Sequence, residues 1–95
     1  MEVKEAIRLA KGYVADVFSD EDPTNVGLEE VEFDDADQTW NVTIGFSRPW
    51  NSTKSMLANL SGEAPPKKRA YKVVRIRDND GKMIAIRRRD ILAAD

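Results

Sequence analysis

The stretch Thr39-Trp40-Asn41-Val42-Thr43-Ile44-Gly45-Phe46-Ser47 decides the fold of this chain. Its large apolar residues, Trp40, Val42, Ile44 and Phe46, alternate with small or polar ones. Because successive side chains of a strand point to opposite faces, the alternation predicts a strand over residues 39–47. One face of this strand is expected to be buried and the other to be solvated.

The preceding segment predicts a partner for this strand. Val31 and Phe33 alternate with glutamates, which indicates a strand over residues 26–34. Leu28 is out of phase with that pair, so we expect a β-bulge near Glu29. The aspartate-rich residues between the two strands predict a turn, which makes the pair an antiparallel hairpin.

A second hairpin is predicted near the C-terminal end of the sequence. Residues 71–77 and 82–89 have strand patterns, and Asp78-Asn79-Asp80-Gly81 between them is typical of a tight turn. Met83 is expected to point away from the core. The sheet residues expected to point into the core are Trp40, Val42, Ile44, Phe46, Val74, Ile76, Ile84 and Ile86.

An amphipathic helix is predicted at the start of the chain, over residues 3–18. Its apolar stripe consists of Val3, Ile7, Ala10, Val14, Val17 and Phe18. Leu9 and Tyr13 lie off this stripe and are expected to be exposed. Gly12 lies on the opposite side, where it is either a tolerated helix residue or a place for close approach of a partner.

These elements predict one α+β domain over residues 1–95, in which the N-terminal helix packs on one face of a four-stranded antiparallel sheet. Residues 48–70 are expected to form an irregular connector between the hairpins. A connection of this length is often functional.

The composition narrows the possible chemistry. The 95 residues include no Cys and no His, which excludes disulfides, thiolate chemistry and ordinary zinc sites. We therefore expect no catalytic residues, no metal and no cofactor. No apolar run is long enough to span a bilayer, and the first residues are too acidic for a secretion signal. A cytoplasmic location without membrane contact is expected.

The charges are distributed unevenly along the chain. Residues 1–66 hold five basic and thirteen acidic residues, whereas residues 67–95 hold ten basic and four acidic ones. Two interpretations follow from this asymmetry. The basic strands lie beside the acidic hairpin and their charges pair at the surface, or the basic end faces an anionic partner.

The second interpretation gives a candidate site on the face of the sheet opposite the helix. Its predicted partner-binding residues are Arg75, Arg77, Arg87, Arg89, Tyr71 and Trp50. Arginine, tyrosine and tryptophan are the usual anchors of protein interfaces. The leading hypothesis is a small non-enzymatic module that binds a protein partner, as an inhibitor or immunity-type protein, or that self-associates. The alternatives are nucleic-acid binding by the same arginines, and a ligand-binding domain with residues 48–66 as a lid.

The order of elements resembles the cystatin-like folds, in particular the PepSY-type domains. The resemblance rests on the strands Glu30-Val31-Glu32-Phe33, Trp40-Asn41-Val42-Thr43-Ile44 and Tyr71-Lys72-Val73-Val74-Arg75-Ile76, and on the turn from Asp78 to Gly81. It implies a small domain that binds or inhibits. The Gln-x-Val-x-Gly inhibitory loop of cystatins is absent from the sequence.

Overall fold

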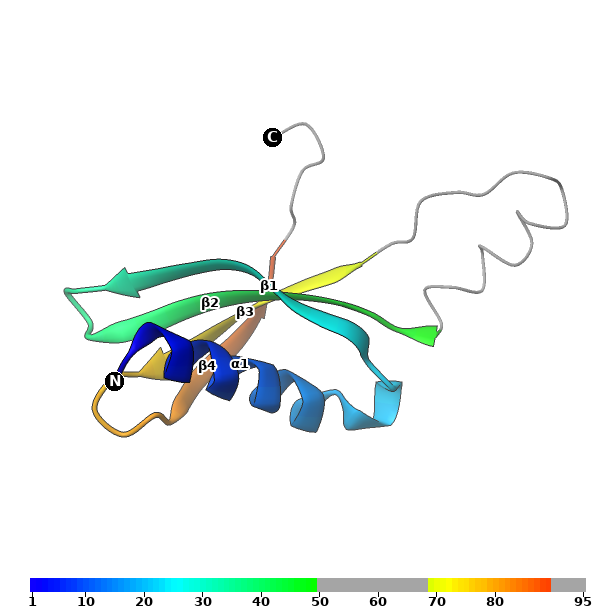
Figure 1. Cartoon of the computed structure of the whole chain (residues 1–95), viewed down its shortest axis with the longest axis horizontal. Coiled ribbons are helices and arrows are strands. Elements are labelled where there is room, and N and C mark those ends of the chain that lie inside the picture. The colour runs from blue at the N-terminus through cyan, green and yellow to red at the C-terminus, as the bar shows by residue number, and fades with distance from the viewer. Residues whose placement is uncertain (50–68, 90–95) are drawn as a thin grey trace, which may run out of the picture.

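One helix and four strands make up the part of the chain that the structure describes, residues 1–49 and 69–89. In this computed structural model, helix α1 (Val3–Val17) is followed by a short 3-10 turn, η1 (Ser19–Glu21). The strands β1 (Thr24–Asp34), β2 (Thr39–Ser47), β3 (Ala70–Arg77) and β4 (Met83–Arg88) form one antiparallel sheet in that order. Helix α1 covers one face of this sheet (Figure 1), so the predicted α+β fold is confirmed.

The predicted boundaries agree with the structure to within two residues. The strand over 39–47 is found as predicted, and β1 begins two residues before the predicted range 26–34. Strand β3 begins one residue early, at Ala70. The predictions for Trp50, for the lid over 48–66 and for most of the connector lie outside the described residues.

The core lies between α1 and the two central strands. It contains eight fully buried apolar residues: Ala6, Ala10, Val14, Val42, Ile44, Phe46, Val74 and Ile76. The register sets Val42 opposite Val74 and Trp40 opposite Ile76, so the apolar residues of β2 and β3 form one continuous face. The alternation in the two central strands therefore predicted their buried face correctly.

Alanines allow α1 to approach the sheet closely. The buried line of the helix consists of Ala6, Ala10 and Val14 rather than of its largest apolar residues. Val3 and Val17, which lie at the two ends of α1, are 42% and 51% exposed. The predicted contact of Val3 with the sheet is therefore wrong, and Val17 lies at the exposed end of the predicted stripe. The other members of the stripe are buried or pack against the core, as predicted.

The same orientation of α1 buries two residues that were expected to be exposed. Leu9 and Tyr13 are half-buried and pack against the core. The Tyr13 hydroxyl donates a hydrogen bond of 2.7 Å to the backbone carbonyl of Gly81 in the turn between β3 and β4. The prediction that Leu9 and Tyr13 are free for a partner is wrong, since the turn after β3 lies against them.

A bulge in β4 overturns the predicted orientation of two residues. The register pairs Ile76 with Met83 but Arg75 with Ala85, which leaves Ile84 as an extra residue. Met83 consequently packs against the core, whereas Ile84 is 49% exposed. The alternation predicted the reverse, because it assumes that every residue of a strand is paired.

The predicted bulge in β1 is confirmed. Leu28 pairs with Ile44 and Glu30 with Thr43, so Glu29 is the extra residue between them. A second irregularity lies between Thr24 and Gly27. Bulges interrupt the row of unpaired backbone groups on an edge strand and thereby oppose pairing with another chain.

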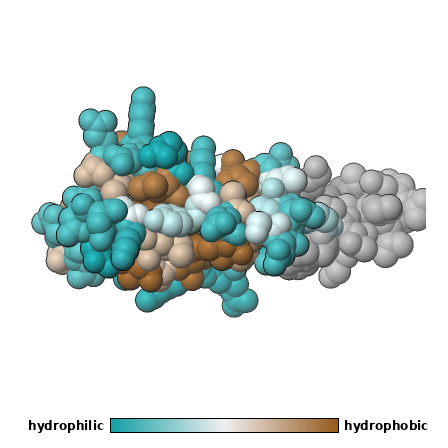
Figure 2. All heavy atoms as spheres, turned by 90° about the horizontal axis from the view of Figure 1, so that it is seen from below, coloured by the Kyte–Doolittle hydropathy of each residue, from teal (hydrophilic) through white to brown (hydrophobic). Residues whose placement is uncertain are grey.

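Apolar surface on the helix side of the molecule is divided into small patches. The view in Figure 2 shows hydrophobic residues separated by hydrophilic ones. Among the described residues the large exposed apolar side chains are Val3, Val17, Leu28, Phe33 and Ile84. No helix within residues 1–49 and 69–89 is long and apolar enough to cross a membrane.

Candidate functional site

The face of the sheet opposite α1, here called the open face, carries the predicted arginines. Arg75 pairs with Asn41, Arg77 with Thr39 and Arg87 with Val73 across the strands. The Arg89 backbone N–H donates to the Tyr71 carbonyl. Because paired residues project to the same side, all four arginines and Tyr71 share the open face, as the alternation predicted. Trp50, the sixth predicted residue, lies outside the described residues.

The middle of the open face is not solvated, contrary to the expectation for β2. Thr43 is 1% exposed and Ser47 is 7% exposed. The long side chains of the neighbouring strands extend over β2; one of them, Arg89, donates a hydrogen bond of 3.3 Å to the Thr43 hydroxyl. The alternation of residue types predicts the face to which a side chain points. It does not predict exposure, because that also depends on how far the side chains of neighbouring strands extend.

Gly45 lies at a crowded point of this face. A Cβ atom at this position would lie 2.7 Å from Glu29 Oε1, 2.9 Å from an Arg69 nitrogen and 3.0 Å from the Tyr71 ring. Arg69 and Glu29 form an ion pair at 3.6 Å, and Arg69 also donates to the Asn25 carbonyl at 3.0 Å. The absence of a side chain at Gly45 therefore leaves room for Glu29 of β1 and Arg69, which directly precedes β3, to pair across β2.

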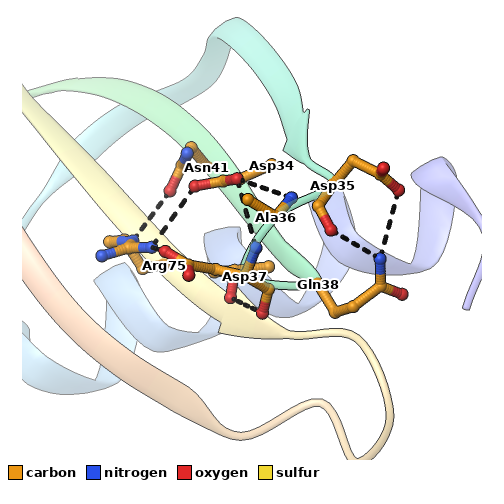
Figure 3. A network of polar contacts seen from close by, with 8 residues as sticks. Asp34, Asp35, Ala36, Asp37, Gln38, Asn41 and Arg75 are labelled. Carbon is orange, nitrogen blue, oxygen red and sulfur yellow. Dashed lines mark hydrogen bonds and ion pairs between the residues drawn. The ribbon is translucent and has the colours of Figure 1, made fainter.

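Arg75 is held by three groups from the first hairpin (Figure 3). Its Nε donates to the Asn41 side-chain oxygen at 3.0 Å. Its terminal nitrogen lies 3.4 Å from an Asp37 oxygen and 3.9 Å from an Asp34 oxygen. These contacts hold the guanidinium in place and largely compensate its charge.

The acids that hold Arg75 are themselves fixed by the turn between β1 and β2. Asp34 Oδ1 accepts hydrogen bonds from the backbone N–H groups of Ala36 at 3.1 Å and Asp37 at 3.3 Å. The Gln38 side chain donates to the Asp35 carbonyl at 2.8 Å (Figure 3). Such aspartate turns order the chain locally, so the acidic stretch is a defined structural element.

Two other arginines of the open face are also paired. Arg89 forms an ion pair with Glu30 of β1, across the whole width of the sheet. Arg77 lies 3.5 Å from an Asp80 carboxylate oxygen in the turn after β3. The basic strands thus lie beside the acidic hairpin, as the first interpretation of the charge asymmetry predicted. Each such exposed pair is worth about 0–1 kcal/mol.

Arg87 differs from these arginines, because it forms no hydrogen bond or ion pair with another described residue. It borders an open, shallow hollow of about 400 Å³ on the open face. The hollow is lined by Asp34, Asp37, Asn41, Val73, Arg75, Arg87, Arg88 and Arg89. Four arginines and two aspartates thus line it, so the formal charge of the lining side chains is positive.

A separate cationic group lies on the helix side of the sheet. The Lys72 ammonium is 5.4 Å from the centre of the Phe18 ring. Partial burial, followed by the charges of Arg48 and Arg88, lowers the Lys72 pKa. Arg48 forms an ion pair with Glu21 at 2.9 Å. Lys72 and Arg48 thus contact the end of α1 and the turn after it, whereas Arg88 also lines the hollow of the open face.

Asp78 links the first residue of the chain to the second hairpin. Its Oδ1 accepts from the Met1 amine at 2.9 Å and from the Trp40 indole N–H at 2.9 Å. The bond from the amine, followed by that from Trp40, lowers the Asp78 pKa, and the same contact raises the pKa of the amine. No pattern in the sequence indicates this contact, because residues 1 and 78 are far apart in the chain.

Neither a cluster of metal-ligating side chains nor a known relative assigns a function to the described residues. Within residues 1–49 and 69–89, no group of three or more Asp, Glu, His or Cys residues is arranged to hold a metal ion. No protein-family model matches the chain, and comparisons with curated proteins and with solved structures gave no significant match. The resemblance to cystatin-like and PepSY-type domains remains a prediction.

Proposed function

We propose that this chain is a small protein-interaction module that binds its partner on the open face of β2, β3 and β4. The observation that carries the proposal is a row of arginines that are already oriented on a face without a covering element among the described residues. Arg75 and Arg89 are held by acids of the first hairpin. Side chains that are ordered before binding lose less conformational entropy when a partner arrives.

The composition of this face supports a protein partner over a nucleic acid. Acidic side chains, Asp34, Asp37 and Glu30, lie between or beside the arginines. A polyphosphate chain crossing the face would meet these carboxylates and be repelled by them. A protein surface of mixed charge would complement both signs, which favours specific docking.

The edges of the sheet are less suited to docking than its face. Strand β1 contains two irregularities and β4 contains one. Such bulges oppose the addition of a further strand. The proposal therefore concerns contacts of side chains on the open face, either with another protein or with a second copy of this chain.

The experiment compares two charge reversals in opposite layers of the fold. Arg87→Glu changes the open face, and Arg8→Glu changes an exposed position of α1. A partner is first identified by cross-linking in native lysate and is then purified, and its affinity for each variant is measured by titration calorimetry. Sedimentation of the purified chain shows whether the partner is a second copy.

We expect Arg87→Glu to weaken the purified partner's affinity by about tenfold or more, and Arg8→Glu to leave it unchanged. Equal affinities for the wild-type chain and Arg87→Glu would contradict the proposal. A chain that remains monomeric and cross-links to no protein would contradict it as well.

A further inference from the structure

We infer that the hollow beside Arg87 is a receptor for a carboxylate of an acidic peptide segment in the partner. The inference rests on the proposed function and names the chemistry of the partner at one point of the open face. Arg87 is the only arginine of the open face without an ion pair among the described residues.

The position of Arg87 concentrates positive charge at the hollow. On β4 it lies two residues before Arg89, on the same face. Arg75 contributes to the same hollow. Glu30 pairs with Arg89 and Asp37 pairs with Arg75, so the charges of these two guanidiniums are compensated, whereas Arg87 has no ion pair among the described residues. An external anion would compensate the charge of Arg87.

The geometry of the guanidinium determines which anion fits best. Arginine presents N–H donors in a planar fork that matches the two oxygens of a carboxylate. The Arg87 side chain is exposed, and its cross-strand neighbour Val73 is half-buried in the lining of the hollow. The carboxylate of an Asp or Glu side chain can therefore bind the Arg87 guanidinium while its methylene groups contact Val73.

The flanking acids limit the length of the anion that the hollow accepts. Asp34 and Asp37 belong to its lining. A single carboxylate at Arg87 brings one negative charge into the hollow with these acids, whereas successive phosphates of an oligonucleotide bring several and are repelled more strongly. This arrangement favours an isolated acidic residue in a peptide over a continuous polyanion.

The experiment titrates the chain with acetyl-tetraglutamate-amide at low ionic strength and records nitrogen–proton NMR spectra. Acetyl-tetraglutamine-amide is the neutral control, and an oligouridine of similar length is the polyanion control. Arg87→Gln removes the free guanidinium. Arg77→Gln is the matched control, because Arg77 lies on the same open face and is paired with Asp80. Both arginines are exposed, so both variants are expected to keep the wild-type fold.

We expect saturable shifts of the Arg87 Nε–H and the Val73 amide signals with the glutamate peptide and none with the glutamine peptide. Arg87→Gln should weaken the peptide affinity by about tenfold, and Arg77→Gln should change it by less than about twofold. If these signals do not shift when the glutamate peptide reaches about 10 mM, the inference is overturned. Equal losses in the two variants, or tighter binding of oligouridine at Arg87, would overturn it too.

This test separates the inference from the proposed function. If the glutamate peptide fails to bind while a purified partner still depends on the open face, only the carboxylate receptor is disproved. If the peptide binds but no partner requires the open face, the proposed function is disproved and the anion site stands.

Discussion

At the scale of single residues, Gly45 sets how closely the strands approach across the open face. We expect Gly45→Ala to lower the free energy of unfolding by about 1 kcal/mol or more, because overpacking displaces neighbouring groups. The Arg69 and Glu29 ends can move at little cost, but the Tyr71 ring is 3.0 Å from the new methyl group. Urea denaturation followed by Trp fluorescence measures the change.

Gly12 provides the matched comparison for this substitution. No atom lies within 4 Å of the place where its Cβ would be, and Gly12 lies inside α1. Gly12→Ala should therefore raise the free energy of unfolding by about 1 kcal/mol, since alanine is the better helix former. If Gly45→Ala also raises the free energy of unfolding, as Gly12→Ala is expected to do, then the neighbours of Gly45 accommodate the added methyl group and the prediction of crowding at Gly45 is wrong. Loss of partner binding in Gly12→Ala would instead favour the second contact face considered for α1.

Residue types predicted the members of the open face but not their contacts. Alternation was sufficient to place Arg75 and Arg87 on one side of the sheet. It could not show that Arg75 is held by acids and that Arg87 is not, because pairing depends on which side chains the first hairpin brings near. The difference between a paired and a free arginine is a tertiary property.

At the scale of elements, the bulge in β4 gives two isoleucines different roles. Ile86 pairs with Val74 and packs against the core, whereas Ile84 is the unpaired, exposed residue. We expect Ile86→Ala to lower the free energy of unfolding by about 2 kcal/mol, and Ile84→Ala to lower it by less than about 1 kcal/mol. Urea midpoints of the two variants measure this difference. Equal losses would mean that β4 is paired without the bulge.

Elements of regular period were easier to predict than their irregularities. The bulge at Glu29 was predictable, because Leu28 and Val31 are out of phase and both are apolar. The bulge at Ile84 was not, because Met83 and Ile84 are both apolar and either could face the core. The helix and most of its buried stripe were predicted correctly, but Val3 and Val17 are exposed and Ala6 is buried instead, because a single alanine is a weak hydrophobic signal.

At the scale of the whole molecule, the charge asymmetry of the sequence becomes a set of contacts between the two hairpins. The ion pair of Arg89 with Glu30 joins the C-terminal hairpin to β1, which lies at the opposite edge of the sheet. The fold thereby places the acidic segment of the chain beside the basic one and leaves Arg87 without an ion pair among the described residues. The separation of acidic and basic residues along the sequence predicted that the two hairpins pair their charges. It could not show that Arg87 is the arginine without an ion pair.

The contact of Asp78 with the Met1 amine closes α1 onto the second hairpin, and Figure 1 shows the N-terminus beside that turn. We expect Asp78→Asn to lower stability most between about pH 4 and pH 8. The folded-state pKa of Asp78 is lowered, so its contribution is present above the ordinary value of 3.8 and is lost as the pH falls through the folded-state pKa. The pKa of the amine is raised, so its contribution is present below 8.0 and is lost as the pH rises through the raised value.

The measurement is the difference in urea midpoint between the wild-type chain and Asp78→Asn across the pH range. This difference should be largest near neutrality and should shrink at both ends, because at low pH the carboxylate is protonated and at high pH the amine is neutral. Asp20→Asn makes the same change of charge at an exposed residue of η1 and should show no such maximum. A difference for Asp78→Asn that is constant with pH would mean that the indole of Trp40, which does not titrate, provides the whole contribution of this contact.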